Sequence, residues 1–289
     1  MPTVQLVPTL RRRRLGEALR RYRREAGMSI EQAATVMRWD NSKVSRIENA
    51  KAHIRPAEAS QLLSVYGVDA PDVLSAIETL ARDAGKKGWW TTYGDVLTAG
   101  YKDYLSLETD AESTRICTPS LIPGLLQTGA YAREIIGAVS FWRPQEEVHA
   151  LAEVRKARQS VLTGRVGRPP LNFWAVIHES VLHQRFASQP SLMREQLRHL
   201  LDMAVLPNVT IQILPMAMAP NPGMMGLFEV VRFPVPWPTV VLTEHMVGGQ
   251  FVEGTEHVQI FEASFDRIVA AALPVDQSRE TIKRIMEKD

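Results

Sequence analysis

Apolar residues recur at helical spacing through the first 85 residues of the chain. Over 15–26 they return every three or four positions, which predicts an amphipathic helix. Ser29 and Gln32 have the S-x-x-Q spacing of a capping box, so a second helix is expected to begin there. Two later helices are expected over 56–66 and 71–84, each opened by a proline. With a third helix between these pairs, the pattern predicts a bundle of five short helices.

The third predicted helix, SKVSRIEN, separates its apolar residues from its polar ones. Asp40 or Asn41 can cap it. At about 100° per residue, Val44 and Ile47 point into the core and Glu48 falls near the buried side. The opposite face gathers Ser42, Ser45, Arg46 and Asn49, with Lys43 and Asn41 at its margin. A face with donors and cations but no carboxylate can reach base edges and phosphates, whereas a solvated helix more often alternates charge signs.

Beyond residue 85, helix-like and strand-like segments intermingle. Helical patterns cover 99–114, 129–138, 144–163, 189–205, 255–273 and 277–288. Runs rich in β-branched and aromatic residues predict strands over 171–178, 208–215, 226–233 and 239–245. Gly85-Lys86-Lys87-Gly88 is a plausible junction. We therefore predict two domains, 1–85 and 86–289, and an α+β fold in which an all-α bundle precedes a mixed α/β domain with helices packed on a sheet.

The charge distribution changes this picture. The net charge is only +2, but residues 1–55 hold 13 Lys and Arg against 5 Asp and Glu, while the remainder holds 21 against 27. A basic N-terminal part on a mildly acidic body suggests a polyanionic partner. A solvated arginine-rich segment would give the same asymmetry.

The sequence also limits the cellular compartment of the protein and the chemistry of its single cysteine. No apolar run approaches the roughly 20 residues of a membrane span, and the N-terminal basic cluster follows a mild apolar stretch, the wrong order for a secretory signal. We expect a cytoplasmic protein with no membrane partner. The single cysteine, Cys117, excludes an internal disulfide framework. Arg115 nearby could lower its pKa and make a redox sensor, but a lone cysteine is more often a small buried hydrophobe.

Enzyme motifs are mostly absent. His178 and His183 invite a metalloprotease interpretation, but they are five residues apart, whereas the zinc motif needs them four apart on one helical face. Ordinary helix-surface histidines are the better account. The chain lacks a nucleophile elbow, a phosphate loop and a dinucleotide fingerprint. We expect no catalytic residue, no metal and no cofactor.

Aromatic and methionine residues suggest a binding surface in the second domain. Trp89, Trp90 and Tyr93 crowd its start, and Met224 and Met225 lie in a proline-rich loop between two predicted strands. Flexible methionines and aromatics often line adaptable binding surfaces, so these five residues are candidates for ligand or partner binding. The alternative is that the aromatics pack in a core.

The stretch SIEQAATVMRWDNSKVSRIENAKAHIRP resembles the helix-turn-helix of lambda-repressor-like regulators, the xenobiotic-response-element family. The resemblance implies a recognition helix in the major groove. Two positions depart from that family's pattern. Its turn glycine is Arg38 here, where a positive φ would be strained. Its phosphate-clamping glutamine is Ile30, which cannot hydrogen-bond. A bundle that has kept only protein contacts is the alternative.

The body resembles a second family over almost its whole length. The segments LIPGLLQTGAYAREI, VIHESVLHQRF and REQLRHLLDMAVLPNVTIQILP are similar to a domain of unknown function from actinobacterial helix-turn-helix regulators, with IPGLLQT followed by YAR as the most specific element. Genes of that family often lie beside one for a small protein, and the pair is described as antitoxin-like. The resemblance implies a regulator with a sensory or partner-binding domain.

These observations combine into a sequence-specific DNA-binding transcriptional regulator that binds double-stranded DNA. Asn41, Ser42, Ser45 and Arg46 are expected at base edges. Lys43, Asn49, Lys51, Arg55 and Ser29 are expected at the phosphate backbone. A homodimer is expected, because one recognition helix spans too few base pairs to be selective. The alternative function is an antitoxin-like protein that sequesters a small partner from a neighbouring gene and binds DNA for autoregulation. An enzyme fused to a DNA-binding domain is a third hypothesis.

Overall fold

The computed structural model describes residues 9–84, 88–165, 167–235, 237–245 and 248–288. The chain splits into two compact units, one of Met1–Thr91 with Pro234–Trp237 and the other of Thr92–Phe233 with Pro238–Asp289. The predicted junction at residues 85–88 lies mostly outside the described residues, so the boundary between 85 and 86 stays a prediction.

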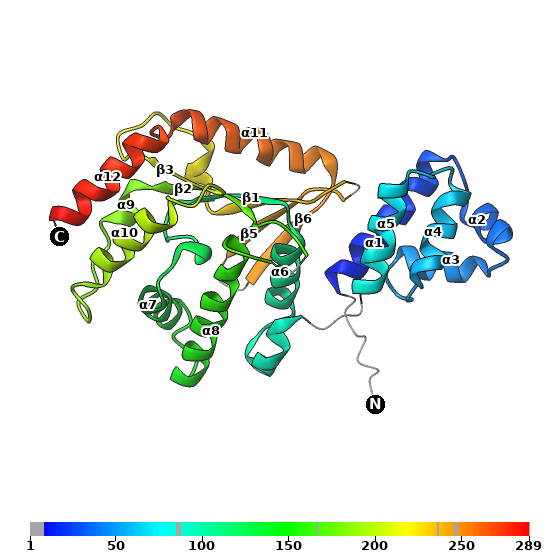
Figure 1. Ribbon diagram of the computed structural model, residues 1–289, viewed down its shortest axis with the longest axis horizontal. Coiled ribbons are helices and arrows are strands. Elements are labelled where there is room, and N and C mark those ends of the chain that lie inside the picture. Colours follow the sequence, from blue (N-terminus) through cyan, green and yellow to red (C-terminus); the bar gives the residue numbers. More distant parts are fainter. Residues whose placement is uncertain (1–8, 85–87, 166, 236, 246–247, 289) are drawn as a thin grey trace. The chain divides into compact units, whose positions relative to one another are not determined.

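The N-terminal unit is a bundle of five helices, as the apolar periodicity predicts (Figure 1). Each begins near a residue suited to start a helix, with Thr9 and Ser29 as side-chain caps and proline opening the last two. The helices are α1 (Leu10–Glu25), α2 (Ile30–Met37), α3 (Asn41–Glu48), α4 (Pro56–Val65) and α5 (Pro71–Asp83).

One apolar core holds this bundle together. Leu19, Ile47 and Leu62, from three different helices, are fully or almost fully buried in it. At Gly16 the backbone of α1 lies so close to the end of α3 that an added Cβ would be 2.6 Å from the carbonyl oxygen of Glu48. A glycine is therefore needed there, because a methyl group would push α3 away from α1.

The C-terminal unit is built on one six-stranded sheet with the strand order β3-β2-β1-β4-β5-β6. The pairings β1–β2 and β2–β3 are parallel, and the pairings β1–β4, β4–β5 and β5–β6 are antiparallel. The strands are β1 (Ser113–Thr118), β2 (Asn172–His178), β3 (Val209–Leu214), β4 (Phe228–Arg232), β5 (Val240–His245) and β6 (Gly248–Val252).

Helices cover both faces of this sheet (Figure 1). One face packs under α11 (Thr255–Ala271), where Val176, Val230 and Phe265 form part of a buried apolar cluster. On the other face lie α6 (Ala99–Asp110), α7 (Gly129–Val139) and α8 (Gln145–Arg158). The remaining helices are α9 (Glu179–Leu182), α10 (Leu192–Met203) and α12 (Val275–Lys288), with short 3-10 turns η1 (Trp89–Val96), η2 (Gly124–Leu126), η3 (Gln159–Leu162) and η4 (Pro222–Met225).

The α+β prediction is confirmed, but two strands were missed. Strand β1 occupies residues that the pattern partly assigns to the end of a helix over 99–114. Residue 110 ends α6, and the run STRICT then forms a central strand whose polar residues alternate with buried ones only in part. Strand β6, GGQFV, carries two glycines, which disfavour a strand in isolation. Its pairing with β5 supplies the stability that its own residues do not give a strand.

Candidate nucleic-acid interface

The entry to α2 is fixed by the capping box that the spacing of Ser29 and Gln32 predicts. The Gln32 N–H donates to Ser29 Oγ at 3.1 Å, and the Ser29 N–H donates to Gln32 Oε1 at 2.8 Å. Ser29 is exposed at the helix N-terminus, where phosphate binding is favourable. Ser29 Oγ already accepts a hydrogen bond from the backbone of Gln32. Its hydroxyl hydrogen is therefore the group that can bind a phosphate.

Arg38 forms the turn between α2 and α3 in a left-handed conformation, with φ 55° and ψ 43°. The positive φ that the resemblance implies at this position is therefore present, although the residue is not glycine. A left-handed residue with a Cβ costs about 1–2 kcal/mol. The turn thus keeps the helix-turn-helix geometry at the expense of local strain.

Helix α3 buries and exposes the residues that its periodicity predicts. Val44 and Ile47 are buried in the bundle. The exposed residues are Asn41, Ser42, Arg46 and Asn49, and Ser45 is half-buried beside them. The Arg46 Nε donates to the Ser42 carbonyl oxygen at 3.2 Å, and the Arg46 side chain is exposed. This surface, defined by Asn41, Ser42, Ser45, Arg46 and Asn49, is called the recognition face below.

Glu48, the one acidic side chain of α3, is withdrawn from the recognition face by an ion pair with α1. Arg23 Nε donates to Glu48 Oε1 at 2.7 Å and Arg23 Nη2 donates to Glu48 Oε2 at 2.9 Å. Both residues are buried, with 4% of Glu48 and 8% of Arg23 exposed. The hydrogen bond to Glu48 raises the pKa of the Arg23 guanidinium. The Glu48 carboxylate is therefore held inside the bundle and is not part of the recognition face.

Arg20 fixes the C-terminal end of the recognition face. Its Nη2 donates to the Glu48 carbonyl oxygen at 3.0 Å and to Asn49 Oδ1 at 2.8 Å. The Asn49 Nδ2 donates in turn to the Ser45 carbonyl oxygen at 2.8 Å. The side-chain oxygen and nitrogen of Asn49 both form hydrogen bonds within the protein. Asn49 can therefore bind a phosphate only if one of these hydrogen bonds breaks. Otherwise, Arg20 would have to make the phosphate contact next to it.

The predicted phosphate-binding cations differ in what surrounds them. Lys43 Nζ donates to Glu58 Oε1 at 2.8 Å and lies 3.7 Å from the centre of the Trp39 ring. The Lys43 hydrogen bond lowers the pKa of the Glu58 carboxyl, which stays ionised and offsets the lysine charge. Lys51 and Arg55 are exposed. Lys51 and Arg55 are therefore better placed than Lys43 to bind a phosphate.

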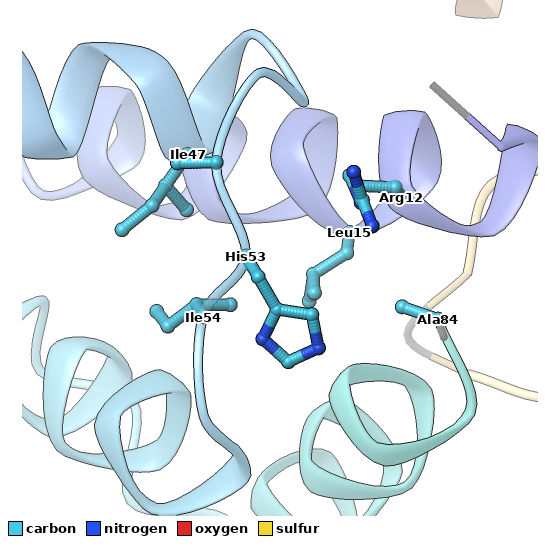
Figure 2. Close-up of a pocket in the computed structure, with 7 residues that line it drawn as sticks. Arg12, Leu15, Ile47, His53, Ile54 and Ala84 are labelled. Carbon is cyan, nitrogen blue, oxygen red and sulfur yellow. The ribbon is translucent and has the colours of Figure 1, made fainter. Parts of the chain in front are cut away.

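A small cavity lies within the N-terminal bundle. Figure 2 shows His53 and Arg12 at a pocket between α1, α5 and the segment after α3. Its volume is about 10 Å³, which is the size of one water molecule.

In the C-terminal unit, a buried ionic cluster joins α6, α8 and β4. Arg158 binds Glu108 through two hydrogen bonds, Nε to Oε2 at 2.9 Å and Nη2 to Oε1 at 2.6 Å. Arg158 Nη2 also donates to the Tyr104 hydroxyl at 2.8 Å, and that hydroxyl donates to Glu229 Oε2 at 2.9 Å. One guanidinium thus faces two carboxyl groups below the surface.

Glu229 is the residue of this cluster whose ionised form is disfavoured most clearly. Burial and the neighbouring Glu108 carboxylate raise its pKa to about 7, against the opposing hydrogen bond from Tyr104 and the charge of Arg158. The carboxyl of Glu229 therefore takes up or releases a proton near neutral pH. The sequence predicts the strand over 226–233 but not this cluster, because the cluster depends on contacts with two distant helices.

The residues behind the metalloprotease and redox-sensor interpretations can each be located in the structure. His178 ends β2 and caps α9, and His183 follows that helix, so the two rings do not share one helical face. The prediction that both histidines lie on a helix surface is therefore wrong for His178. Cys117 is 2% exposed in β1, and burial raises its pKa to about 12, the opposite of what a reactive thiolate needs. Among the described residues, no group of three or more His, Cys, Asp or Glu could hold a metal ion.

The predicted ligand- or partner-binding residues are divided between the two units, with Trp89 and Trp90 in the first and Tyr93, Met224 and Met225 in the second. Trp89 and Trp90 contact edge to face at 5.9 Å, with Trp90 buried and Trp89 39% exposed. Tyr93 is half-buried. On η4, Met224 is 65% and Met225 is 90% exposed, so both methionines lie on the surface of the C-terminal unit. The core interpretation holds for Trp90, and the binding role of the five residues stays a prediction.

Several residues that shape the recognition face escaped the sequence interpretation. Arg23, Arg20 and Glu58 act through partners 15 to 29 positions away in the chain. Helical periodicity places them on a face but cannot name a partner on another helix. Gly16 carried a usable signal, since a glycine within a predicted helix often marks a close helix contact.

Together, a strained turn and a polar recognition helix on a five-helix bundle define a helix-turn-helix DNA-binding domain, the kind found in transcriptional regulators. A family model described as a helix-turn-helix domain matches residues 14–76. A second model, described as a domain of unknown function (DUF5753), matches residues 101–284, and the chain belongs to this family.

Neither the curated proteins nor the solved structures that we compared gave a match to the chain. No helix within the described ranges combines the length and the apolar character that crossing a membrane requires.

Proposed function

We propose that this protein is a sequence-specific transcriptional regulator whose N-terminal unit reads an operator and whose C-terminal unit controls when it does so. The observation that carries the proposal is the recognition face. Its side chains are donors, acceptors and one arginine, and the carboxylate of the same helix is buried against Arg23. Such a surface favours contact with base edges and phosphates. A regulator of this kind works in the cytoplasm.

The residues divide between base contacts and backbone contacts. Asn41, Ser42, Ser45 and Arg46 are proposed to read base edges, with Arg46 suited to a guanine because it is exposed and a guanidinium can donate two parallel hydrogen bonds. Lys51 and Arg55 are proposed as the main phosphate contacts, with Ser29, Lys43 and Asn49 as weaker ones. Arg20 holds Asn49 in place and supplies further positive charge.

Two copies are needed for selective binding. One recognition helix contacts only a few base pairs, so regulators of this class bind paired half-sites as dimers. We therefore propose a homodimer.

The C-terminal unit is proposed to sense a small ligand or to bind a small partner protein, and we assign it no catalytic role. The surface methionines Met224 and Met225 support an adaptable contact. The antitoxin-like alternative, in which this unit mainly sequesters a small partner, predicts that such a protein co-purifies with the chain from its native cell.

The base-reading role is tested with Arg46→Ala. If Arg46 reads a guanine, the variant loses about 1–3 kcal/mol of binding free energy on the operator and tolerates substitutions at one base pair. Binding is measured by fluorescence anisotropy on an operator series that varies one base pair at a time.

The matched control is Arg279→Ala, which removes the same charge from an exposed position of α12 and should leave DNA affinity unchanged. An equal loss of affinity for Arg46→Ala on all sequences would reassign Arg46 to a phosphate. No loss on any sequence would contradict the proposed recognition face.

A further inference from the structure

The three parallel strands of the C-terminal unit begin at the same end of the sheet, and a groove lies there. Strands β1, β2 and β3 start at Ser113, Asn172 and Val209. The groove has a volume of about 190 Å³ and is lined by residues 113–115, 172–174, 207, 208 and 210. Sites for drug-sized molecules measure roughly 300–1,000 Å³, so only a small molecule fits. We call this site the strand-start groove.

The strand register places five side chains of the groove on one face of the sheet. Trp174 is aligned with Arg115 on one side and with Thr210 on the other. Ser113 and Asn172 precede Arg115 and Trp174 by two positions, so they share this face.

This face becomes apolar farther along the strands. Two positions beyond Arg115 and Trp174, Cys117 and Val176 are buried in the apolar cluster that includes Phe265 of α11. The polar side chains are thus confined to the start of the strands, where the groove lies.

The guanidinium of Arg115 is held in place by aromatic rings. Its carbon atom lies 5.5 Å from the centre of the Trp174 ring and 5.8 Å from the centre of the Phe265 ring. Trp174 Nε1 donates to Gln212 Oε1 at 2.8 Å, and Gln212 Nε2 donates to the Leu273 carbonyl oxygen at 2.9 Å. The ring that orients Arg115 is therefore itself fixed. A cation that is oriented before binding loses little freedom when it meets an anion.

The ionic partner of Arg115 can be displaced by a ligand. Arg115 Nη1 donates to Asp266 Oδ1 at 3.3 Å, and 71% of the Asp266 side chain is exposed. An exposed ion pair of this kind contributes little to stability. Arg115 is the one charged residue among the described residues that line the groove. The groove therefore favours a ligand with a negative charge.

Uncharged polar side chains provide the other contacts in the groove. Ser113, Asn172 and Thr210 make no side-chain hydrogen bond to another residue in the described ranges. Neighbouring strands are about 4.8 Å apart and alternate residues about 6.6 Å apart, so these positions and Arg115 span about 7 by 10 Å. Hydroxyl and amide groups both donate and accept hydrogen bonds, which matches the hydroxyl groups of a small polar ligand.

We propose that the strand-start groove binds a small hydroxylated carboxylate, such as a sugar acid. The carboxylate pairs with the Arg115 guanidinium, whose parallel N–H groups match its two oxygens. The hydroxyl groups of the ligand bond to Ser113, Asn172 and Thr210. The inference rests on the proposed function in one respect, since it names the chemistry of the ligand that the C-terminal unit is proposed to sense. The groove itself is defined by the strands and does not depend on DNA binding.

Titration with D-gluconate tests the site. The indole N–H signal of Trp174 is followed by nuclear magnetic resonance in the isotope-labelled full-length protein and is assigned with Trp174→Phe. Gluconate should shift this signal with a Kd of about 1 mM, as expected for a ligand of this size. Neutral D-glucose and inorganic phosphate should each bind at least about fivefold more weakly, because glucose lacks the charge and phosphate lacks the hydroxyl groups.

Two variants should change the affinity for gluconate in opposite directions. Asp266→Asn removes the carboxylate that competes for Arg115 and should tighten binding about two- to fourfold. Arg115→Met should weaken binding at least about tenfold, because it removes the charged partner of the carboxylate. The matched control is Arg267→Met, which removes an exposed cation next to Asp266 and should change the affinity at most about twofold.

The site is supported by gluconate binding that Asp266→Asn strengthens and Arg115→Met weakens. The gain in Asp266→Asn decides the matter even if Arg115→Met fails to fold. An unchanged Trp174 signal at about 20 mM gluconate overturns the site, as does an affinity that Asp266→Asn leaves unchanged. Equal affinity for gluconate and phosphate would mean an adventitious ion only and would overturn the ligand class.

DNA binding is measured separately on the same protein, so the two proposals can fail independently. A protein that binds gluconate at Trp174 but no DNA would overturn only the proposed function. A protein that binds DNA selectively but not gluconate would overturn only the strand-start groove as a ligand site.

Discussion

Each unit of this protein buries an arginine against a glutamate, but the two arrangements differ in their charge balance. In the N-terminal unit, Arg23 and Glu48 form a pair with two short hydrogen bonds, and Arg20 is a second cation 3.7 Å from the same carboxylate. In the C-terminal unit, Arg158 binds Glu108 in the same two-point manner, and Glu229 joins through Tyr104. The first pair is neutral as a whole, whereas the second cluster holds one carboxyl group more than it has cations.

The difference shows what a buried ion pair can be used for. Around Glu48, the pair with Arg23 removes a carboxylate from the recognition face. Around Glu229, the surplus carboxyl must stay protonated or raise the energy of the fold, since burial and Glu108 both disfavour its charge. One arrangement shapes a binding surface, and the other makes the stability of its unit depend on pH.

The largest effect is expected from breaking the balanced pair. Arg23→Met keeps the length of the side chain but leaves Glu48 buried with only Arg20 nearby, at 3.7 Å. We expect the N-terminal unit to lose about 3 kcal/mol of stability, because an unpaired buried charge is strongly destabilising. Hydrogen exchange of the α1 and α3 amides measures this unit separately, and the exchange should become about 150-fold faster.

Arg24→Met is its control, since Arg24 is exposed on the same helix and should change the exchange about twofold at most. Adding Glu48→Gln to Arg23→Met should recover most of the loss. Equal effects of Arg23→Met and Arg24→Met would show that the pair does not hold α3.

A smaller effect is expected at Glu229, and it depends on pH. The pKa of Glu229 is about 7 in the folded protein, above the ordinary value of 4.5, so the folded state binds the proton more tightly than the unfolded chain. This contribution to stability is fully present below about pH 4.5 and is lost as pH rises through 7. Glu229→Gln keeps an acceptor for the Tyr104 hydroxyl and should remove this slope.

At pH 8 the variant should be more stable than the native protein by an amount on the order of 1–3 kcal/mol. The measurement is the exchange free energy of the β1 and β4 amides between pH 5 and 8. Glu112→Gln serves as control, since it removes an exposed carboxylate that does not contribute to the pKa of Glu229 and should keep the slope. An unchanged slope in Glu229→Gln would assign the pH dependence to another group.

The smallest effect concerns a feature of the N-terminal unit that involves no charge pair. Arg38→Gly relieves the left-handed strain, and the greater freedom of glycine in the unfolded chain offsets part of the gain. The net result should be about 0.5–1 kcal/mol of added stability, seen in the same α1 and α3 amides. Thr35→Gly, inside α2, should have the opposite sign. A loss of stability in Arg38→Gly would mean that the arginine side chain makes a contact worth more than the strain.

Local pattern predicted the parts of the molecule that depend on local physics. The capping box at Ser29, the buried side of α3 and the positive φ at Arg38 all follow from spacing, periodicity or a family resemblance, and the structure contains each of them. Strands β1 and β6 escaped prediction because their stability comes from neighbours rather than from their own residues.

Long-range contacts explain the rest of what was missed. The pairing of Arg23 with Glu48 and the cluster around Glu229 join residues that only the fold brings together. The recognition face could be predicted, but the means by which its carboxylate is removed could not. The hydrogen bond from Lys43 to Glu58 could not be predicted either. It makes Lys43 a weaker candidate for a phosphate contact than Lys51 and Arg55.

The central claim is that the N-terminal unit reads DNA by sequence, and one binding experiment tests it most directly. The full-length protein is titrated against fluorescent DNA from upstream of its own gene and against unrelated DNA of equal length, at several salt concentrations. The account predicts tight, selective binding whose affinity falls steeply with salt, because cations such as Lys51 and Arg55 displace counterions from phosphates. Weak binding that is equal on both DNAs would contradict it.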